Sequence, residues 1–570
     1  MWTSPVEYGG RPASPVVLGI NRTQDASICL MRGSELVWAI QKERLTRQKH
    51  HWGRLDDLRN IYRARLPGLD QPIDILVECY SSDTEISRLG AYELELAEVL
   101  ALAPGSRHAH ISHHLAHVYS AFHPSPFREA AVMIIDGQGS RVADFTEPWE
   151  GARWVPGDWC EIASFYSATR ERIDCLSKQL WNRDEQAPAG LGMFYFLLTQ
   201  AIFPGEGNEG KVMGLAPHGR AHAFELPPLE VNDGQVTIPA RWRSLLRERA
   251  RFRYTGSDDA RFSQIADLAA AGQHAFEEAL IEVARWLHAE TGADDLCFAG
   301  GTALNCPANE RLLRETPFKR LFIPPAPGDA GTSVGCAMYG LAELAGQRCH
   351  FRWTQDYLGP PPAASAIEAA VADCPDLCVE RIGDADVLRA RMVSLLCEGK
   401  VVALFQGGSE FGPRALGHRS ILGDPRSAGM RDGINLMIKR REWFRPLAPV
   451  VLLEAAETYF EVRRPVPFMQ YAAPVRARAA QLIPAVTHVD GSARLQTVGE
   501  DDDPFLRALL IEFQARTGLP VLLNTSFNRK EEPIVETPAE ALATFRATPL
   551  HALVMPPFLV RKQVEPDALG

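Results

Sequence analysis

Runs of apolar residues separated by short polar turns predict a three-stranded meander near the start of the chain. Residues 15–20, 26–31 and 35–40 are each long enough for one strand, and Arg32-Gly33-Ser34 between the last two is a typical hairpin turn. Farther along, residues 130–135 form another apolar run of strand length. Short apolar runs of this kind are typical of buried strands, so the pattern predicts an α/β protein.

A second group of signals combines helical spacing with glycine-rich turns. Apolar positions recur at helical spacing over residues 262–291 and predict a core helix there. The run 296–299 that follows predicts a strand, which ends in two glycines and opens a further helix. Glycine turns after buried strands let backbone N–H groups approach a phosphate or a ligand ring. The candidate nucleotide-binding residues are Gly137, Gly300, Gly301, Asn305 and Asp329.

A proline-rich linker divides the chain. Residues 358–364 contain three consecutive prolines after a glycine, which interrupts both helices and strands. A new apolar run at residues 401–405 then opens another α/β region. We therefore expect one domain over residues 1–358 and a second over residues 366–570.

Two histidines four positions apart predict a metal site. His113 and His117 would face the same side of a helix and can bind one ion. No glutamate follows His113, so the HExxH pattern of zinc proteases is absent. A histidine pair with carboxylates from elsewhere suits a first-row divalent metal, iron included. The alternative is a pair of histidines on a helix surface.

Residues 439–449, KRREWFRPLAP, predict an anion site. They place four cations within seven residues and lead into an apolar run. A solvated basic face is the usual meaning of a charge run, but here the cations are interleaved with tryptophan, phenylalanine and proline. Guanidinium and ammonium groups, with the hydroxyl and amide side chains of residues 412–420 and 524–528, match the needs of a phosphate ester.

Composition restricts the partners. The 570 residues include 60 Lys and Arg against 71 Asp and Glu, a net charge of −11, which disfavours a nucleic-acid backbone and suits a cationic small molecule. The start of the chain lacks a signal-peptide pattern, and no apolar stretch approaches the length of a membrane span. The 11 cysteines are scattered. We expect a soluble cytoplasmic protein that binds neither nucleic acid nor membrane.

Residues 412–420, 439–449 and 524–528 resemble the C-terminal half of the O-carbamoyltransferases of nodulation-factor and antibiotic biosynthesis. Residues 41–50 and 205–217 resemble two stretches of the N-terminal half, and both are candidates to line an acceptor cleft. The resemblance therefore covers nearly the whole chain. It implies an actin-like (ASKHA, threonylcarbamoyl-transferase-like) two-lobed domain, followed by a YrdC-like α/β domain.

The resemblance also implies a reaction. In this family, carbamoyl phosphate and ATP yield carbamoyl-AMP in the C-terminal domain, and the carbamoyl group then moves to a hydroxyl in the N-terminal domain. An aminoglycoside such as tobramycin or kanamycin is the expected acceptor, and a homodimer is the default assembly. The implied catalytic residues are Lys439, Arg445, Arg414, Ser526 and Asn528. The residues expected to bind substrate are Arg494, Asn524, Lys211 and His50.

A second resemblance concerns the metal. The N-terminal half is similar to the universal tRNA threonylcarbamoyl-transfer subunit, whose HxxxH binds iron together with carboxylates. This implies Fe²⁺ as a cofactor, beside ATP and Mg²⁺. The implied iron ligands are His113, His117, Asp136 and Asp329.

The sequence departs from the family pattern before residues 25–27. The family usually has a histidine where Gln24 stands. If that histidine serves as the general base for the acceptor hydroxyl, this protein must use another group, such as Asp25 or His50.

Three rival functions share parts of these patterns. A non-catalytic actin-like ATPase module would leave residues 439–449 unexplained. A tRNA threonylcarbamoyl-type enzyme would need a basic surface for tRNA, which the acidic balance disfavours. A hydrogenase-maturation carbamoyltransferase normally carries zinc-finger cysteine pairs and an acylphosphatase-like segment, which the sequence lacks.

Overall fold

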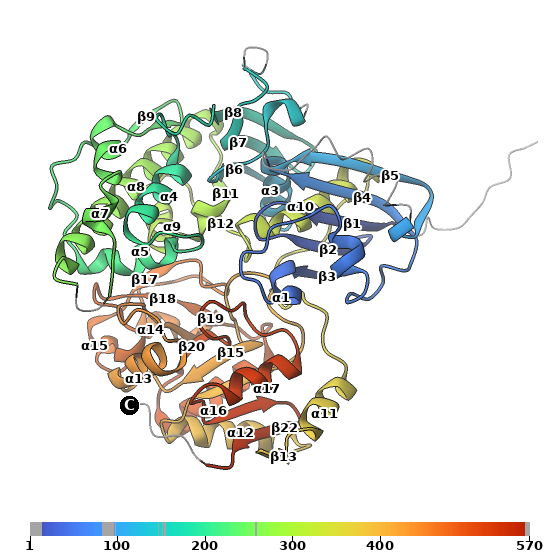
Figure 1. Ribbon diagram of the computed structural model, residues 1–570, viewed down its shortest axis with the longest axis vertical. Coiled ribbons are helices and arrows are strands. Elements are labelled where there is room, and N and C mark those ends of the chain that lie inside the picture. Colours follow the sequence, from blue (N-terminus) through green and yellow to red (C-terminus); the bar gives the residue numbers. More distant parts are fainter. Residues whose placement is uncertain are drawn as a thin grey trace, which may run out of the picture.

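A computed structural model gives the arrangement of the chain. Two lobes lie side by side, one blue and one largely green, and the orange-to-red part of the chain lies below both (Figure 1). Sheets and helices occur in all three parts, which confirms the predicted mixed α/β class. The structure describes residues 14–81, 96, 98–145, 147–150, 152, 155–256 and 259–564.

The first lobe is built on a five-stranded sheet. Its elements are β1 (Val16–Asn21), β2 (Ser27–Arg32), β3 (Glu35–Gln41), α1 (Lys42–Thr46), η1 (Leu58–Tyr62), β4 (Ile73–Tyr80) and β5 (Leu102–Ser112). The strand order is β3-β2-β1-β4-β5. The first three strands form the predicted antiparallel meander, and β4 and β5 run parallel to β1. Alternate side chains such as Val17 and Leu18 enter different apolar clusters, so both faces of the sheet are buried.

The second lobe repeats this topology. Its sheet contains β6 (Glu129–Ile135), β7 (Cys160–Thr169), β8 (Ile173–Trp181), β11 (Asp295–Ala299) and β12 (Arg320–Phe322). The order is β12-β11-β6-β7-β8, with an antiparallel β6-β7-β8 meander and with β11 and β12 parallel to β6. Strand for strand, β6 therefore takes the place of β1. The two lobes share one topology although the sequence shows no repeat of fixed period.

Two helices in equivalent positions pack against each other between the lobes. They are α3 (His113–Phe122), which follows β5, and α10 (Thr332–Tyr339), which follows β12 through η7 (Asp329–Gly331). A Cβ atom on Gly335 of α10 would lie 1.8 Å from the carbonyl oxygen of Ala116 in α3. A Cβ atom on Gly19 of β1 would lie 2.1 Å from the carbonyl oxygen of Ser333. Glycine at both positions thus allows α10 to contact α3 and β1 directly.

Helices cover the outer side of the second lobe. The helix α8 occupies the full range predicted from apolar spacing, and the buried residues along it pack against α4. Within the part of the chain that the structure describes, no helix has the length and apolar character needed to cross a membrane. The remaining elements of this region are η3 (Val142–Asp144), α4 (Leu191–Ile202), α5 (Glu209–Leu215), η5 (Ala216–His218), β9 (Glu230–Asn232), β10 (Gln235–Thr237), α6 (Ala240–Leu246), α7 (Arg249–Phe252), α8 (Phe262–Thr291), η6 (Gly301–Leu304), α9 (Cys306–Glu315) and η8 (Gly340–Leu344).

The third part is an eight-stranded mixed sheet with helices around it. Its strands are β13 (Leu377–Arg381), β14 (Val402–Phe405), β15 (Arg419–Gly423), β16 (Ala448–Leu452), β19 (Gln496–Val498), β20 (Val521–Ser526), β21 (Ala552–Met555) and β22 (Phe558–Lys562), in the order β13-β22-β21-β14-β15-β20-β16-β19. A separate pair consists of β17 (Ala472–Pro474) and β18 (Ser492–Arg494). The helical segments are α11 (Ala364–Ala372), α12 (Ala385–Cys397), α13 (Ala428–Gly433), η9 (Ile434–Ile438), η10 (Leu453–Ala455), α14 (Ala456–Tyr459), α15 (Ala477–Ala480), η11 (Pro484–Val486), α16 (Pro504–Thr517) and α17 (Pro538–Arg546).

Polar contacts join the third part to both lobes. From the first lobe, a guanidinium nitrogen of Arg44 donates to the carbonyl oxygen of Gly412 at 3.0 Å, and Arg47 donates to the carbonyl oxygen of Ile534 at 2.7 Å. From the second lobe, Glu310 forms an ion pair with Arg464 at 2.6 Å. Because these contacts use buried or half-buried side chains, the third part has a defined position beneath the lobes.

We expect Gly335→Ala to destabilise the protein. The new methyl group would collide with the backbone of α3, and overpacking of this kind costs about 1–3 kcal/mol. Urea unfolding followed by circular dichroism would measure the loss. The matched control is Gly383→Ala, because a Cβ atom there meets nothing within 4 Å. Equal midpoints for both variants would contradict the close packing of α3 and α10.

Candidate active site

Five cations gather between loops of the third part. We call Arg414, Lys439, Arg441, Arg445 and Arg494 the cation cluster. Burial lowers the pKa of all five, and cationic neighbours within the cluster lower it further for the first four. The pKa of Arg414 falls to about 9, because its guanidinium is buried and lies near Arg494 and Arg445. The cations predicted from the sequence are therefore brought together.

The cation cluster has very little counter-charge. Among the described residues, only Arg445 of the five is within ion-pair distance of a carboxylate, Glu442, at 3.7 Å. Glu442 is shared, because it also pairs with Lys211 at 3.1 Å. Buried like charges without partners are costly, and a bound anion would remove much of that cost. The electrostatics are those of a phosphate site.

Uncharged oxygens hold Lys439 in place. Its ammonium donates to Ser526 Oγ at 3.0 Å, to Asn528 Oδ1 at 2.7 Å, and to the carbonyl oxygens of both residues. Ser526 Oγ also donates to Asn528 Oδ1 at 2.6 Å. These contacts fix the ammonium without neutralising it. The predicted trio of Lys439, Ser526 and Asn528 is thus assembled as one unit.

Asn524 lies on β20 next to this unit and is 1% exposed. Its Nδ2 donates to Ala415 O at 3.1 Å and to Gln496 Oε1 at 2.8 Å, while its Oδ1 has no hydrogen-bond partner among the described residues. A buried acceptor without a donor fits a ligand that carries N–H groups, as a carbamoyl group does.

Four side chains from both lobes converge on a second centre. His113 and His117 come from α3, Asp136 follows β6, and Asp329 begins η7. The Nε2 atoms of the two histidines lie 3.1 Å apart, and His113 Nε2 lies 3.2 Å from Asp136 Oδ2 and 3.4 Å from Asp329 Oδ1. His117 Nε2 lies 3.4 Å from Asp136 Oδ2. The predicted ligand set is therefore brought together around one point.

The donor set fits a metal ion. The Nε2 atoms of His113 and His117 face each other, and both side chains are fully buried. A metal ion between the two nitrogens would supply the positive charge that their lone pairs need in the absence of water. Imidazole and carboxylate donors suit first-row divalent metals. Donor separations of 3.1–3.4 Å, with 3.9 Å between His117 Nε2 and Asp329 Oδ1, allow bonds of about 2.0–2.2 Å to a common centre.

His114 points away from this centre and belongs to a hydrogen-bond network that supports the fold. Its Nδ1 lies 2.7 Å from Ser164 Oγ, and its backbone N–H donates to Glu161 at 3.0 Å. Lys178 pairs with Glu161 at 2.8 Å. Burial lowers the pKa of His114 to about 3, so the ring is neutral. The network holds the start of α3, and with it His113, against β7.

Most of the predicted glycine turns pack against other parts of the protein, which leaves little room for a ligand. A Cβ atom on Gly300, which has a φ of 95°, would lie 2.2 Å from the carbonyl oxygen of Ile135, and Gly301 N donates to Asp136 Oδ1 at 3.0 Å. Gly137 differs, because a Cβ atom there would meet nothing within 4 Å. Of the predicted nucleotide-binding glycines, Gly137 is the one with room for a phosphate.

Asn305 is used differently from the expectation. It is 4% exposed, its Oδ1 accepts from Ala308 N and from Gln273 Nε2, and its Nδ2 donates to Gln273. The side chain therefore caps α9 and ties it to α8. This engagement argues against the predicted role in nucleotide binding.

His50 and Lys211 lie where the first and second lobes face the cation cluster. Lys211 pairs with Glu442 rather than standing free for a phosphate. His50 Nδ1 lies 2.9 Å from Asp25 Oδ1, and its ring faces Gly207 of the loop before Lys211. The two predicted acceptor-cleft stretches therefore meet each other.

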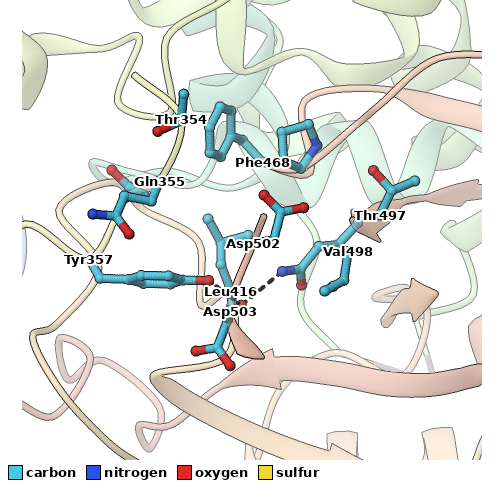
Figure 2. Close-up of a pocket in the computed structure, with 12 residues that line it drawn as sticks. Thr354, Gln355, Tyr357, Leu416, Phe468, Thr497, Val498, Asp502 and Asp503 are labelled. Carbon is cyan, nitrogen blue, oxygen red and sulfur yellow. Dashed lines mark hydrogen bonds between the residues drawn. The ribbon is translucent and has the colours of Figure 1, made fainter. Parts of the chain in front are cut away.

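Two pockets adjoin the Arg414 loop. The larger, of about 300 Å³, is lined by Tyr357 and Phe468 and by the carboxylates of Asp502 and Asp503 (Figure 2). It contains none of the predicted site residues. The smaller, of about 210 Å³, lies between Arg414 and residues 303–304, 325 and 327, just before Asp329. The smaller pocket thus has Arg414 of the cation cluster in its lining, whereas none of the four residues of the metal-type centre lines it.

Several residues at these centres were missed by sequence reasoning. Arg441 lies in the cationic run of residues 439–449 but was not predicted as a site residue. Gln496, which orients Asn524, lies outside every motif. Glu442, the shared counter-charge, reads as an ordinary surface acid in the sequence. Only its position between cations signals its role.

Both halves of the chain match models of one enzyme family. Residues 88–338 match the model described as carbamoyltransferase N-terminus, and residues 393–562 match that of carbamoyltransferase C-terminus. Nodulation protein NolNO of Sinorhizobium fredii is 34% identical over 95% of this chain and 79% of its own. Nodulation protein NolO of Bradyrhizobium diazoefficiens is 35% identical over 80% of this chain and 79% of its own. A crystal structure of full-length HypF in the phosphate- and nucleotide-bound form is similar over 58% of this chain and 56% of its own, with 12% identity and a TM-score of 0.36.

These matches define the protein as an enzyme that transfers carbamoyl groups. The chain belongs to the NodU/NolO family of carbamoyltransferases. The resemblance inferred from the motifs is confirmed at the level of this family. Both relatives are named for nodulation, so they give no support to the narrower expectation of an aminoglycoside enzyme.

We expect the four-residue centre to bind a divalent metal. His117→Ala would remove one of two buried nitrogen donors and should lower the metal content of the purified protein after loading with Fe²⁺ under anaerobic conditions. Elemental analysis by mass spectrometry measures this. His222→Ala is the control, because His222 is exposed and its ring meets that of His274 edge to face, away from the four-residue set. A metal content unchanged in His117→Ala would contradict the assignment.

We expect inorganic phosphate to stabilise the protein through the cation cluster. A ligand present at 100 times its Kd adds about 2.7 kcal/mol to the free energy of unfolding. The melting temperature should rise with phosphate concentration, and Arg494→Gln should weaken this dependence, with Arg478→Gln, an exposed arginine, as the control. A phosphate response that survives Arg494→Gln unchanged would show that the ion binds elsewhere.

Proposed function

We propose that the protein is an ATP-dependent O-carbamoyltransferase that forms carbamoyl-AMP from carbamoyl phosphate and transfers its carbamoyl group to a hydroxyl. The observation that carries this proposal is the cation cluster, in which buried Lys439 and four half-buried arginines have one shared carboxylate within ion-pair distance among the described residues. A donor with a phosphate group supplies the missing negative charge. The assignment divides the chain into an actin-like domain (residues 1–358) and a YrdC-like domain (residues 366–570).

The repeated strand order of the two lobes supports the actin-like part of this proposal. Two equivalent sheets with equivalent helices between them are the expected result of duplicating one lobe. The open space at Gly137 and the N–H group of Gly301 lie beside Asp136, where phosphates of ATP would bind with Mg²⁺.

At the cation cluster, the chain's own groups would bind and orient the donor. Arg445, Arg441 and Arg494 would neutralise phosphate oxygens, and Lys439 would hold the departing phosphate. Asn524 Oδ1 would accept from the carbamoyl NH₂ group. Hydrolysis of carbamoyl phosphate would leave carbamate, whose oxygen would attack the α-phosphate of ATP and release pyrophosphate.

At the second centre, His113, His117, Asp136 and Asp329 would hold Fe²⁺, which supplies Lewis acidity toward the carbonyl of the transferred group. Enclosure by the third part would keep water from the labile carbamoyl-AMP.

For the acceptor we propose an amino sugar, with aminoglycosides such as tobramycin or kanamycin first. The support is the net charge of −11 and the carboxylates of Asp25, Glu43 and Glu209 near His50, which suit ammonium groups. The relatives named for nodulation favour a second candidate of the same chemistry, a chitooligosaccharide.

Product analysis tests the reaction and the acceptor together. Protein with Fe²⁺, Mg²⁺, ATP and carbamoyl phosphate would be offered tobramycin, kanamycin, a cephem and a chitooligosaccharide, and mass spectrometry would detect a gain of one carbamoyl group. We expect an amino sugar to be modified with matching AMP. Arg445→Ala should abolish the product, because it removes a phosphate-binding cation, while Arg478→Ala should not.

The omission controls separate the alternatives. ATP turnover whose rate does not depend on carbamoyl phosphate would overturn the proposal and favour the non-catalytic ATPase module. Pyrophosphate released from ATP only when carbamoyl phosphate is present, with no acceptor modified, would retain the reaction and reject only the acceptor.

A further inference from the structure

We propose that His50 is the base that removes the proton from the acceptor hydroxyl and that Asp25 positions it. This inference rests on the proposed carbamoyl transfer and assigns the proton step of that same reaction. The pair consists of His50 Nδ1 and Asp25 Oδ1 at 2.9 Å.

The backbone is shaped to hold this pair. Asp25 and His50 both adopt left-handed backbone conformations, with φ of 51° and 53°. Residues other than glycine seldom take this conformation. The backbone N–H of His50 donates to Glu43 Oε2 at 3.0 Å, and Asn21 Nδ2 donates to the carbonyl oxygen of Asp25 at 3.2 Å. Two strained positions that face each other across a hydrogen bond indicate a functional constraint.

The other ring nitrogen of His50 has no hydrogen-bond partner among the described residues. With the Nδ1–H group donating to Asp25, Nε2 carries the lone pair. It lies against Gly207, where a Cβ atom would lie only 2.1 Å away, so only glycine lets the loop approach the ring this closely. The side chains of His50 and Asp25 are 26% and 28% exposed, which lets an acceptor reach them.

The pair also lies between the two centres. On one side, the turn that carries Asp25 is bonded to Asp329, through Asn21 Nδ2 to its carbonyl oxygen at 2.9 Å and Thr23 Oγ1 to its Oδ2 at 2.8 Å. On the other side, Lys49 is close enough to Arg445 and Lys211 for their charges to lower its pKa. An acceptor bound at His50 is therefore flanked by both the metal-type centre and the cation cluster.

A metal ion held by Asp25, Glu43 and His50 is a less suitable explanation of this group. One oxygen of Glu43 accepts from Arg44 at 3.1 Å and the other accepts the backbone N–H of His50. Both oxygens are thus engaged, whereas the hydrogen bond between Asp25 and His50 leaves one nitrogen for a proton.

The charges around His50 suit a base. Burial lowers its pKa, but hydrogen bonding to Asp25 and the charges of Asp25 and Glu43 outweigh burial and the charge of Lys49, so the net shift is upward from 6.5. Glu209 from the facing loop adds a further acidic group. A base with a raised pKa is more strongly proton-accepting, and it becomes inactive at pH values below that pKa.

The proton step balances as follows. The acceptor O–H bond breaks and its proton passes to His50 Nε2, while the freed electron pair forms a bond from the acceptor oxygen to the carbamoyl carbon. The bond from that carbon to the phosphate oxygen then breaks, and AMP leaves with the electron pair. Asp25 stabilises the resulting imidazolium, which later releases its proton to water.

The test separates the two half-reactions. His50→Gln should lower kcat for carbamoylation of the acceptor about 10²–10⁴-fold, whereas the first-turnover burst of pyrophosphate from carbamoyl phosphate and ATP should remain. The matched control is His51→Gln, because the neighbouring His51 is bonded to Thr46 at 2.7 Å and makes no contact with Asp25 in the described structure. It should keep both activities.

The positioning role of Asp25 has its own readout. In Asp25→Asn the pKa of His50 should fall, so the acidic limb of the pH profile of kcat should move to lower pH as the maximal rate declines. A merely structural role would lower the rate without moving that limb.

The outcomes distinguish this inference from the proposed function. Transfer at the wild-type rate and pH profile in His50→Gln would overturn the base while leaving the carbamoyltransferase intact. Loss of the pyrophosphate burst in His50→Gln would mean that His50 acts in the formation of carbamoyl-AMP. That result would also overturn its assignment as the base for the acceptor. A wild-type protein that releases no pyrophosphate from ATP when carbamoyl phosphate is added would overturn the proposed function and this inference together.

Discussion

The concentration of positive charge in the third part is the constraint on which the rest of the site depends. Buried Lys439 and four half-buried arginines lie close together, and the one carboxylate within ion-pair distance of them among the described residues, Glu442, is shared with Lys211 of the second lobe. Repulsion of this size persists in a folded protein only if neighbouring groups fix the cations or an anion binds them. The neutral oxygens of Ser526 and Asn528 fix Lys439 in place. A phosphorylated substrate would supply the bound anion.

The second centre depends on a different constraint, the close contact of two equivalent helices. The duplicated lobes place α3 and α10 after the last strand of each sheet, and Gly335 lets the helices approach until backbone meets backbone. That approach brings the two histidines of α3 near Asp329, which begins the turn before α10. Asp136, at the end of β6, completes the set. A side chain at Gly335 would therefore disturb a centre that it does not touch.

Sequence reasoning predicted the elements well because apolar runs and glycine turns are local signals. The meander, α8 and the HxxxH helix all appeared where expected. The duplication of the lobes was not visible as a sequence repeat, since topology can persist after the sequences diverge, and only the family resemblance implied two lobes. Asn305 was misread because a helix cap and a ligand contact use the same amide, and only tertiary contacts with Gln273 distinguish them. Glu442 and Gln496 could not be found, because their roles arise from neighbours that are distant in sequence.

One segment connects the cation cluster physically with the proposed base, His50. The segment before and within α5 contacts His50 through Gly207, pairs with Glu442 through Lys211, and accepts a hydrogen bond from His488 at the carbonyl oxygen of Gly214 at 3.2 Å. An anion bound at the cation cluster would compete with Glu442 for Arg445, and so would change the surroundings of Lys211. Because Lys211 in α5 closely follows Gly207, which lies against His50, occupation of the donor site would alter the surroundings of the proposed base. Coupling of this kind would let acceptor chemistry follow donor binding without a separate moving domain.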